Sequence, residues 1–138
     1  MTPILLLLFI YLLFLSAFSS TEQVESDAMR QHGSSYILSA EQTNQCTPYL
    51  IGGGCNGGLT ESAYRYIKGP GLVQDSDYPY TKTTYEGVTG TCSVDTSKAV
   101  VGIKGYTTIK GETNMANYVS RTIMMMLLLV FVILLIFS

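Results

Sequence analysis

A cysteine inside a glycine-rich run is the feature of this sequence that points most directly to chemistry. Residues 52–58 read GGGCNGG, with Cys55 among the glycines. Glycine gives the backbone access to positive φ and allows another backbone to approach closely. A thiol at this position is suited to a disulfide, a metal site or a nucleophile, or it is an ordinary side chain. The run by itself leaves these four possibilities open.

The remaining reactive or metal-binding residues of the sequence limit the kinds of site that are possible. The sequence holds three cysteines and one histidine, without the C-x₂-C pairing of a zinc site. No G-K-[ST] follows the glycine run, so a phosphate-binding loop is not indicated. The net charge of −2 gives no basic patch for nucleic acid. We therefore expect no metal, no cofactor and no nucleic-acid partner.

Two short helices are expected before the glycine run. Residues 20–33, STEQVESDAMRQHG, begin with cap-like hydroxyl residues and predict a helix that Gly33 ends. Residues 38–46, LSAEQTNQC, predict a second helix that Ser39 caps. Gln42 follows Ser39 by three residues and completes the pattern of a capping box.

A third helix is expected directly after the glycine run. Residues 59–69, LTESAYRYIKG, have the clearest amphipathic pattern of the sequence, and Gly69 is its stop. The expected apolar face consists of Leu59, Ala63, Tyr66 and Ile67.

Strand content is expected only late in the sequence. Ala99–Ile109, AVVGIKGYTTI, is rich in β-branched and aromatic residues and predicts a strand. Glu112–Ser120 is again helical in pattern. Helices followed by strand are typical of an α+β fold.

Two uncharged apolar runs lie at the ends of the sequence. We expect residues 1–19 to be a signal or anchor segment, 20–120 the folded domain, and 121–138 a transmembrane segment. Ala17-Phe18-Ser19 has the small residues of a signal cleavage site, although no Lys or Arg precedes the run. Without that cleavage, the lack of proline and glycine predicts continuous helices over residues 4–31 and 112–137. These ends predict a membrane partner and a secretory, lysosome-like or extracellular location.

Several motifs follow one another in this sequence in an order that is typical of a known protein family. LSAEQTNQC, GCNGGLTESAYRYIK, DSDYPYT and GTC follow one another as in papain-like, cathepsin-type cysteine peptidases, which this sequence resembles from about Ala17 to Ser120. The upstream AFSSTEQVESDAMR resembles the helix that follows the nucleophile motif of that family. The resemblance implies a partial papain-like fold, mainly its helical left-hand half, and peptide or protein substrates and inhibitors as partners.

The catalytic residues of that family have no counterpart in this sequence. The match of Ala17-Phe18-Ser19 assigns the nucleophile position to Leu15 and that of the preceding cysteine to Leu12. The family's histidine and asparagine would lie beyond Ser138. His32 lies on the wrong side of the glycine run and is expected to be an exposed residue at a helix end. The resemblance therefore implies no catalytic residue in this chain.

The same resemblance assigns roles to the cysteines and to the glycine run. It implies a disulfide between Cys46 and Cys92, and it leaves Cys55 as an unpaired thiol. The residues that it implies for substrate binding are Gly57 and Gly58, through their main chain, and Leu59 and Thr60, as a wall of the pocket for the second residue before the scissile bond. The competing interpretation is a tight turn that binds nothing.

Two functional hypotheses follow from this. The first is a papain-family cysteine-type peptidase domain, represented by a truncated and inactive piece. The second is a membrane-tethered pseudopeptidase that uses the old substrate loop to bind a peptide or an inhibitor.

Overall fold

Short helices joined by long loops make up the described part of the chain. The computed structural model describes residues 16–48 and 53–120. Its helices are α2 (Ser16–His32), α3 (Ala40–Cys46), α4 (Thr60–Ile67) and α5 (Lys82–Tyr85), with 3₁₀ turns η1 (Gly54–Asn56) and η2 (Thr96–Lys98). A further helix covers residues 112–120, as the sequence predicts.

The chain divides into two compact units, Met1–Tyr106 and Thr107–Ser138. The helix over residues 112–120 belongs to the second unit. Its first turn is fixed by the Met115 amide, which donates to the Gly111 carbonyl at 3.0 Å, and by the Asn114 side chain, which donates to the Lys110 carbonyl at 2.8 Å. The other helices of residues 16–48 and 53–120 belong to the first unit.

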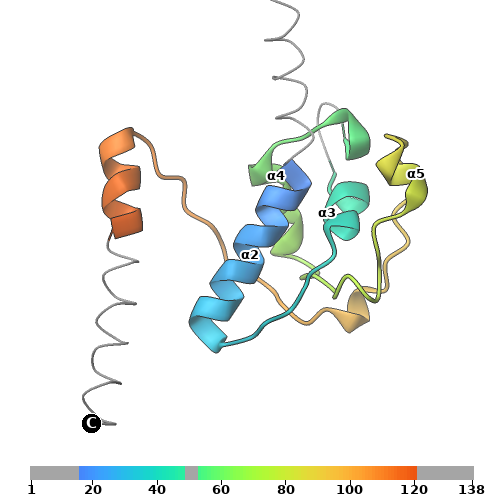
Figure 1. Ribbon diagram of the computed structural model, residues 1–138, viewed down its shortest axis with the longest axis horizontal. Coiled ribbons are helices and arrows are strands. Elements are labelled where there is room, and N and C mark those ends of the chain that lie inside the picture. Colours follow the sequence, from blue (N-terminus) through green and yellow to red (C-terminus); the bar gives the residue numbers. More distant parts are fainter. Residues whose placement is uncertain (1–15, 49–52, 121–138) are drawn as a thin grey trace, which may run out of the picture. The chain divides into compact units, whose positions relative to one another are not determined.

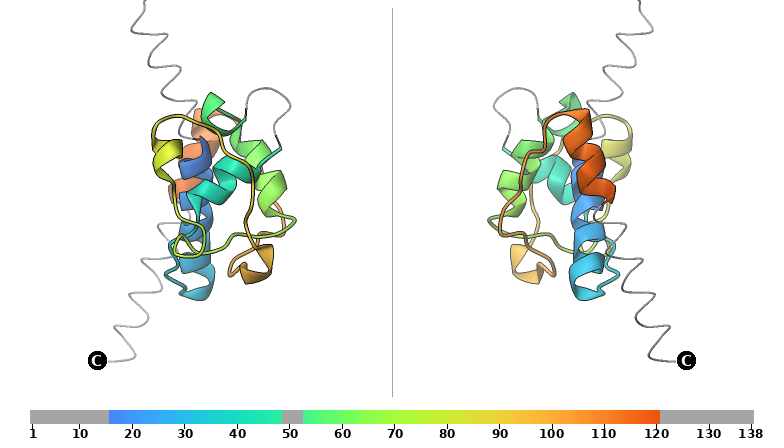
Figure 2. Two further views of the ribbon diagram at one scale, coloured as in Figure 1. Left: turned by 90° about the vertical axis from the view of Figure 1, so that its right-hand side faces the viewer. Right: turned by 90° about the vertical axis from the view of Figure 1, so that its left-hand side faces the viewer.

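Helices α2, α3 and α4 pack against one another and form the core of the first unit (Figure 1). Figure 2 shows these three helices from two further sides. The core is a small hydrophobic cluster of Val24, Leu38, Ile67 and Leu72. Ile67 and Leu72 are completely buried. The fully buried side chains also include polar ones, among them Thr21, Gln42 and Thr43.

Helix α2 ends as predicted, at Gly33. Gly33 adopts a φ of 68°, and its amide donates to the Met29 carbonyl at 2.9 Å, which ends the helix with a left-handed residue. Ser16, the first described residue, is already helical, in agreement with the continuous helix expected over residues 4–31, and Ala17 is buried at 4% exposure. The part of the expected continuous helix before Ser16 lies outside the described residues.

Helix α3 begins as predicted, but only half of the expected capping box forms. The Ser39 hydroxyl accepts a hydrogen bond from the Gln42 amide at 2.9 Å. The Gln42 side chain does not return to the Ser39 amide, which donates instead to the Val73 carbonyl at 3.0 Å. Gln42 is turned inward because Gly71 and Val73 offer it buried backbone partners.

Helix α4 confirms most of the predicted apolar face. Ala63 and Ile67 are completely buried, and Tyr66 packs against the core cluster. Leu59 was expected on this face, and this is wrong, since its side chain is 63% exposed. Leu59 is the N-cap residue and has an extended backbone, with φ −103° and ψ 137°, so it lies outside the helical spacing.

The strand predicted for Ala99–Ile109 is not formed. Within the described residues this segment has one isolated antiparallel bridge, between Leu72 and Val101. A ladder does not extend from it, because the next paired residues would be two positions away on each side of the bridge. Pro70 has no amide to donate, the Gln74 carbonyl accepts from the Asp77 amide, and the Ala99 amide donates to the Thr96 carbonyl. The described part of the expected α+β fold is therefore helical.

The two apolar ends fall mostly outside the described residues. Among residues 16–48 and 53–120, no helix is both long enough and apolar enough to span a bilayer. The expected boundaries at residues 19 and 121, the membrane partner and the continuous C-terminal helix to residue 137 thus stay predictions.

Candidate functional site

The glycine loop, Gly53–Gly58, has a backbone that other residue types would not adopt easily. Gly53 has a φ of 121° and Gly57 a φ of 87°. The Gly53 amide donates to the Gly57 carbonyl at 3.1 Å, so the loop closes on itself around η1. Glycine is required at these positions because a Cβ atom disfavours positive φ.

The turn after α5 fixes the glycine loop from one side. The Thr89 hydroxyl accepts a hydrogen bond from the Cys55 amide at 2.9 Å. The Thr89 side chain also lies against Gly54, where a Cβ atom would collide with it. Gly54 has a φ of 54°, so both its backbone and this close approach require glycine. No pattern in the sequence points to Thr89, since the contact spans more than thirty residues of chain.

Cys55 is buried and does not present its thiol to solvent. Its side chain is 5% exposed. The Asn44 side chain donates to the Cys55 sulfur at 3.6 Å, and that sulfur lies 3.8 Å from the Thr84 carbonyl oxygen. The thiol therefore fills the space beneath the loop and has polar partners from α3 and α5.

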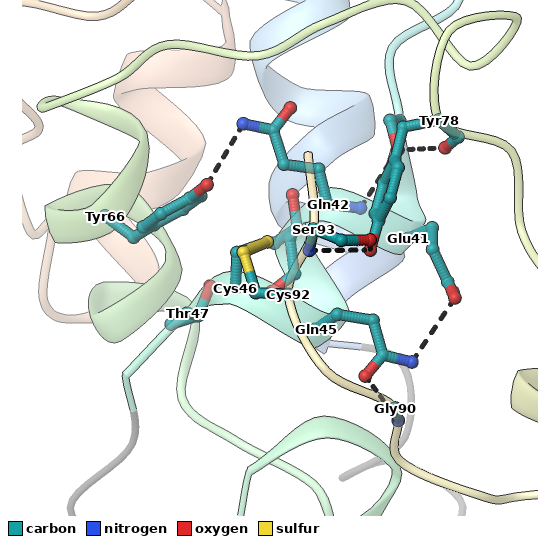
Figure 3. The surroundings of a disulfide bond; sticks show 12 residues. Glu41, Gln42, Gln45, Cys46, Thr47, Tyr66, Tyr78, Gly90, Cys92 and Ser93 are labelled. Atoms are coloured by element: carbon teal, nitrogen blue, oxygen red, sulfur yellow. Dashed lines mark hydrogen bonds between the residues drawn. A yellow bond between two sulfur atoms is a disulfide. The ribbon is translucent and has the colours of Figure 1, made fainter. Parts of the chain in front are cut away.

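Cys46 and Cys92 form a disulfide bond, which is the pair that the resemblance implies. Their Cα atoms lie 4.8 Å apart. Figure 3 shows hydrogen bonds on both sides of this bond, which join the segment that carries Cys92 to α3 and to Tyr78. Gln45 accepts from the Gly90 amide at 2.7 Å, and the Tyr78 hydroxyl accepts from the Ser93 amide at 3.3 Å. The end of α3 is thus tied to the segment that carries Thr89.

A buried carboxylate lies beneath this connection. Glu41 is 2% exposed, and one of its oxygens accepts from the Thr84 hydroxyl at 2.7 Å and from the Gln45 amide at 3.3 Å. Its other oxygen has no hydrogen-bond partner within the described residues. Burial raises the pKa of the nearby Tyr80, and the charges of Cys55 and Glu41 raise it further. The sequence did not single out Glu41 or Thr84, because polar residues in short helices are usually exposed.

The four residues expected to bind substrate lie together at the junction of the glycine loop and α4. Gly57 is buried, Gly58 and Thr60 are half-buried, and Leu59 is exposed. The Gly57 carbonyl is used by the loop itself, as described above. Gly58 has no hydrogen bond on its amide or carbonyl within the described residues. A free backbone donor and acceptor thus stand beside an exposed leucine.

Two positions come into question for catalysis in the sequence, Leu15 and His32, and neither is expected to have a catalytic role. Leu15, at the nucleophile position, lies outside the described residues. His32 is an exposed residue at the end of α2, as expected. Within residues 16–48 and 53–120, no three His, Cys, Asp or Glu side chains form a group that would hold a metal ion.

Comparison with known proteins agrees with this geometry. The model of the papain family of cysteine proteases matches residues 16–129. The chain belongs to the papain family. A cathepsin L-like proteinase of Fasciola hepatica is 35% identical over 75% of this chain, and cysteine proteinase 1 of Entamoeba histolytica is 45% identical over 50% of it.

Solved structures of papain-family proteins show the same fold. Procathepsin L 3 of Tenebrio molitor aligns with a TM-score of 0.68 and 29% identity over 78% of this chain and 34% of its own. The bromelain protease of Ananas comosus, solved with the inhibitor E64, aligns with a TM-score of 0.65 and 29% identity over 76% of this chain and 46% of its own. The match covers 31% of the Fasciola relative, so this papain-family chain spans about a third of such a protein.

Proposed function

We propose that this chain is a non-catalytic papain-family domain that binds an extended peptide along Gly57–Thr60. The observation that carries the proposal is that the amide and carbonyl of Gly58 make no hydrogen bond among the described residues and lie next to the exposed side chain of Leu59. An extended peptide pairs with such backbone groups as an added strand does, and its alternate side chains enter neighbouring pockets. Leu59 and Thr60 would then contact one apolar side chain of the peptide.

Catalysis is not part of the proposal because the chemistry of a cysteine peptidase needs an accessible thiolate. The sequence has three cysteines. Two of them are joined in the disulfide, and Cys55 is buried below the loop. The position that corresponds to the nucleophile is Leu15, whose side chain cannot attack a carbonyl.

The compartment in which the chain would work follows from its disulfide. Disulfides persist in oxidising compartments and are rare where thiols are kept reduced. The bond between Cys46 and Cys92 supports a location in the secretory pathway, in a lysosome-like compartment or outside the cell.

Peptide binding is tested with acetyl-Ala-Leu-Ala-Ala-amide and with the same peptide methylated on the leucine nitrogen. The unmodified peptide should shift the NMR amide signals of Gly58 and Thr60. The methylated peptide cannot donate to the Gly58 carbonyl and should bind roughly fivefold more weakly, the equivalent of one hydrogen bond of about 1 kcal/mol. Equal binding of both peptides, or the absence of shifts at Gly58, would contradict the proposal.

The lack of activity is tested on peptide-fluorophore substrates and with active-site-directed epoxide inhibitors. We expect neither turnover nor a covalent adduct. Cys55→Ser is the control variant. Thiol-dependent turnover that disappears in Cys55→Ser would make Cys55 a displaced nucleophile and would overturn the non-catalytic assignment.

A further inference from the structure

Asn56 and Gly57 are the one asparagine–glycine pair of the sequence, and both belong to the glycine loop. Asn56 is the last residue of η1 and is exposed. Its side chain makes no hydrogen bond within the described residues. The carboxamide of Asn56 is therefore in contact with solvent and is free to turn toward its own backbone.

The backbone amide that follows Asn56 is also unbonded. Gly57 is buried, yet its amide donates no hydrogen bond within residues 16–48 and 53–120, which is uncommon for a buried backbone group. Gly57 has no Cβ atom, so its own residue does not shield this nitrogen from the Asn56 side chain. A backbone nitrogen in this situation can act as a nucleophile toward the carboxamide carbon beside it.

The other three asparagines of the sequence lack these features. Asn44 is buried within α3. Asn114 lies in the helix over residues 112–120, and the amide after it, that of Met115, donates to the Gly111 carbonyl at 3.0 Å. Asn117 lies in the same helix and is followed by a tyrosine, whose Cβ atom shields the next backbone nitrogen. Asn56 thus differs from the others both in the freedom of its side chain and in the amide that follows it.

From this contrast we infer that Asn56 is a site of spontaneous self-modification, at which the Gly57 amide converts asparagine to isoaspartate. The Gly57 nitrogen attacks the side-chain carbonyl carbon of Asn56, and the new bond closes a cyclic succinimide. The side-chain nitrogen leaves as ammonia and takes the proton of the Gly57 amide. Water then opens the ring, at the main-chain carbonyl to give isoaspartate or at the side-chain carbonyl to give aspartate. The reaction consumes water and releases ammonia, and nothing is oxidised or reduced.

The isoaspartate changes the loop that carries the proposed function. The chain now runs through the former side chain, so the backbone before Gly57 gains a methylene group and the former main-chain carbonyl becomes a carboxylate. Two hydrogen bonds close the loop, from the Asn56 amide to the Gly53 carbonyl and from the Gly53 amide to the Gly57 carbonyl, both at 3.1 Å. The longer backbone does not fit between these two bonds, so Gly58 is displaced. This consequence rests on the proposed function, because a displaced Gly58 no longer pairs with a peptide.

The test uses the full chain, incubated in mildly alkaline buffer and then mapped by peptide mass spectrometry. We expect Asn56 to convert to a mixture with more isoaspartate than aspartate. Its rate should exceed that of Asn114 and Asn117 by about tenfold, which corresponds to about 1.4 kcal/mol in the activation free energy. Hydroxylamine, which cleaves a succinimide, should cut the chain between Asn56 and Gly57. Asn56→Gln should abolish both results, because the longer side chain closes its ring far more slowly. Asn117→Gln is the matched control and should change neither.

Conversion of Asn56 at the rate of Asn114 and Asn117 would overturn the inference. Aspartate without isoaspartate would also overturn it, because direct hydrolysis of the side chain needs no succinimide. In the converted chain the NMR amide signals of Gly57 and Gly58 should shift, and unshifted signals would contradict the effect on the loop.

Binding of acetyl-Ala-Leu-Ala-Ala-amide separates this inference from the proposed function. The converted chain should bind this peptide roughly fivefold more weakly than the fresh chain, and incubated Asn56→Gln should keep its affinity. Equal affinity of the converted and fresh chains would contradict the effect on the loop. A fresh chain that does not bind the peptide would contradict the proposed function alone, since peptide mapping, hydroxylamine cleavage and the NMR shifts need no peptide.

Discussion

Replacing Gln42 with leucine should destabilise the first unit severely, because this one side chain joins three segments. Gln42 is completely buried. Its nitrogen donates to the Gly71 carbonyl at 3.0 Å and to the Tyr66 hydroxyl at 3.1 Å. Its oxygen accepts from the Val73 amide at 2.8 Å. Leucine has nearly the same volume but none of these bonding groups.

The expected magnitude follows from the partners that are left behind. The Val73 amide and the Gly71 carbonyl are buried and would each cost about 1–3 kcal/mol when unsatisfied. Tyr66 is half-buried, so its hydroxyl can turn to water. We expect a loss of about 4 kcal/mol in the free energy of unfolding, out of the roughly 5–15 kcal/mol typical of a folded domain.

Urea unfolding followed by circular dichroism measures this loss. The comparison requires that the slope of the free energy of unfolding against urea concentration be the same in the variant and in the unmodified chain. Gln31→Leu is the matched control, because Gln31 lies on the exposed side of α2, and it should change stability by no more than about 0.5 kcal/mol. A loss below about 1 kcal/mol for Gln42→Leu would refute the claim that Gln42 holds the core segments together.

Three further predictions concern the site. When the protein is unfolded without a reductant and then alkylated, peptide mapping should find the label on Cys55 alone. Reduction of the Cys46–Cys92 bond should lower the free energy of unfolding by about 4 kcal/mol, the value of the chain-entropy model for a separation of 46 residues. Label on Cys46 or Cys92 before reduction would contradict the pairing. Because burial raises the pKa of Tyr80 in the folded state, the Tyr80 hydroxyl loses its proton at lower pH in the unfolded chain than in the folded one. The free energy of unfolding should therefore be unaffected below about pH 10 and should fall as the pH rises through the raised pKa. Tyr80→Phe should reduce that fall in alkaline unfolding curves, and an unchanged curve would speak against it. Thr89→Val keeps the contact with Gly54 but removes the hydrogen bond from the Cys55 amide. It should lower the free energy of unfolding by about 1 kcal/mol and weaken the binding of acetyl-Ala-Leu-Ala-Ala-amide. An unchanged affinity for this peptide would show that the glycine loop keeps its conformation without Thr89.

The sequence by itself determined the local features of this protein. The end of α2 at Gly33 and the cap of α3 at Ser39 depend on residues within one helical turn, so short patterns identify them. The burial of Ala63 and Ile67 follows from their spacing on α4 in the same way. The order of the motifs also gave the family, which the match over residues 16–129 establishes.

Only the tertiary structure decided which buried polar groups meet. Gln42 looked like one half of a capping box, but backbone groups about thirty residues away are its partners. The segment Ala99–Ile109 has strand composition but stays irregular, because Pro70 lacks an amide and the Gln74 carbonyl and the Ala99 amide are bonded elsewhere. Propensity describes what a residue prefers among its neighbours in sequence, whereas a buried donor or acceptor must be satisfied by whatever the fold brings to it. For the same reason the contact of Thr89 with the glycine loop has no trace in the sequence, since it exists only after distant segments are packed together.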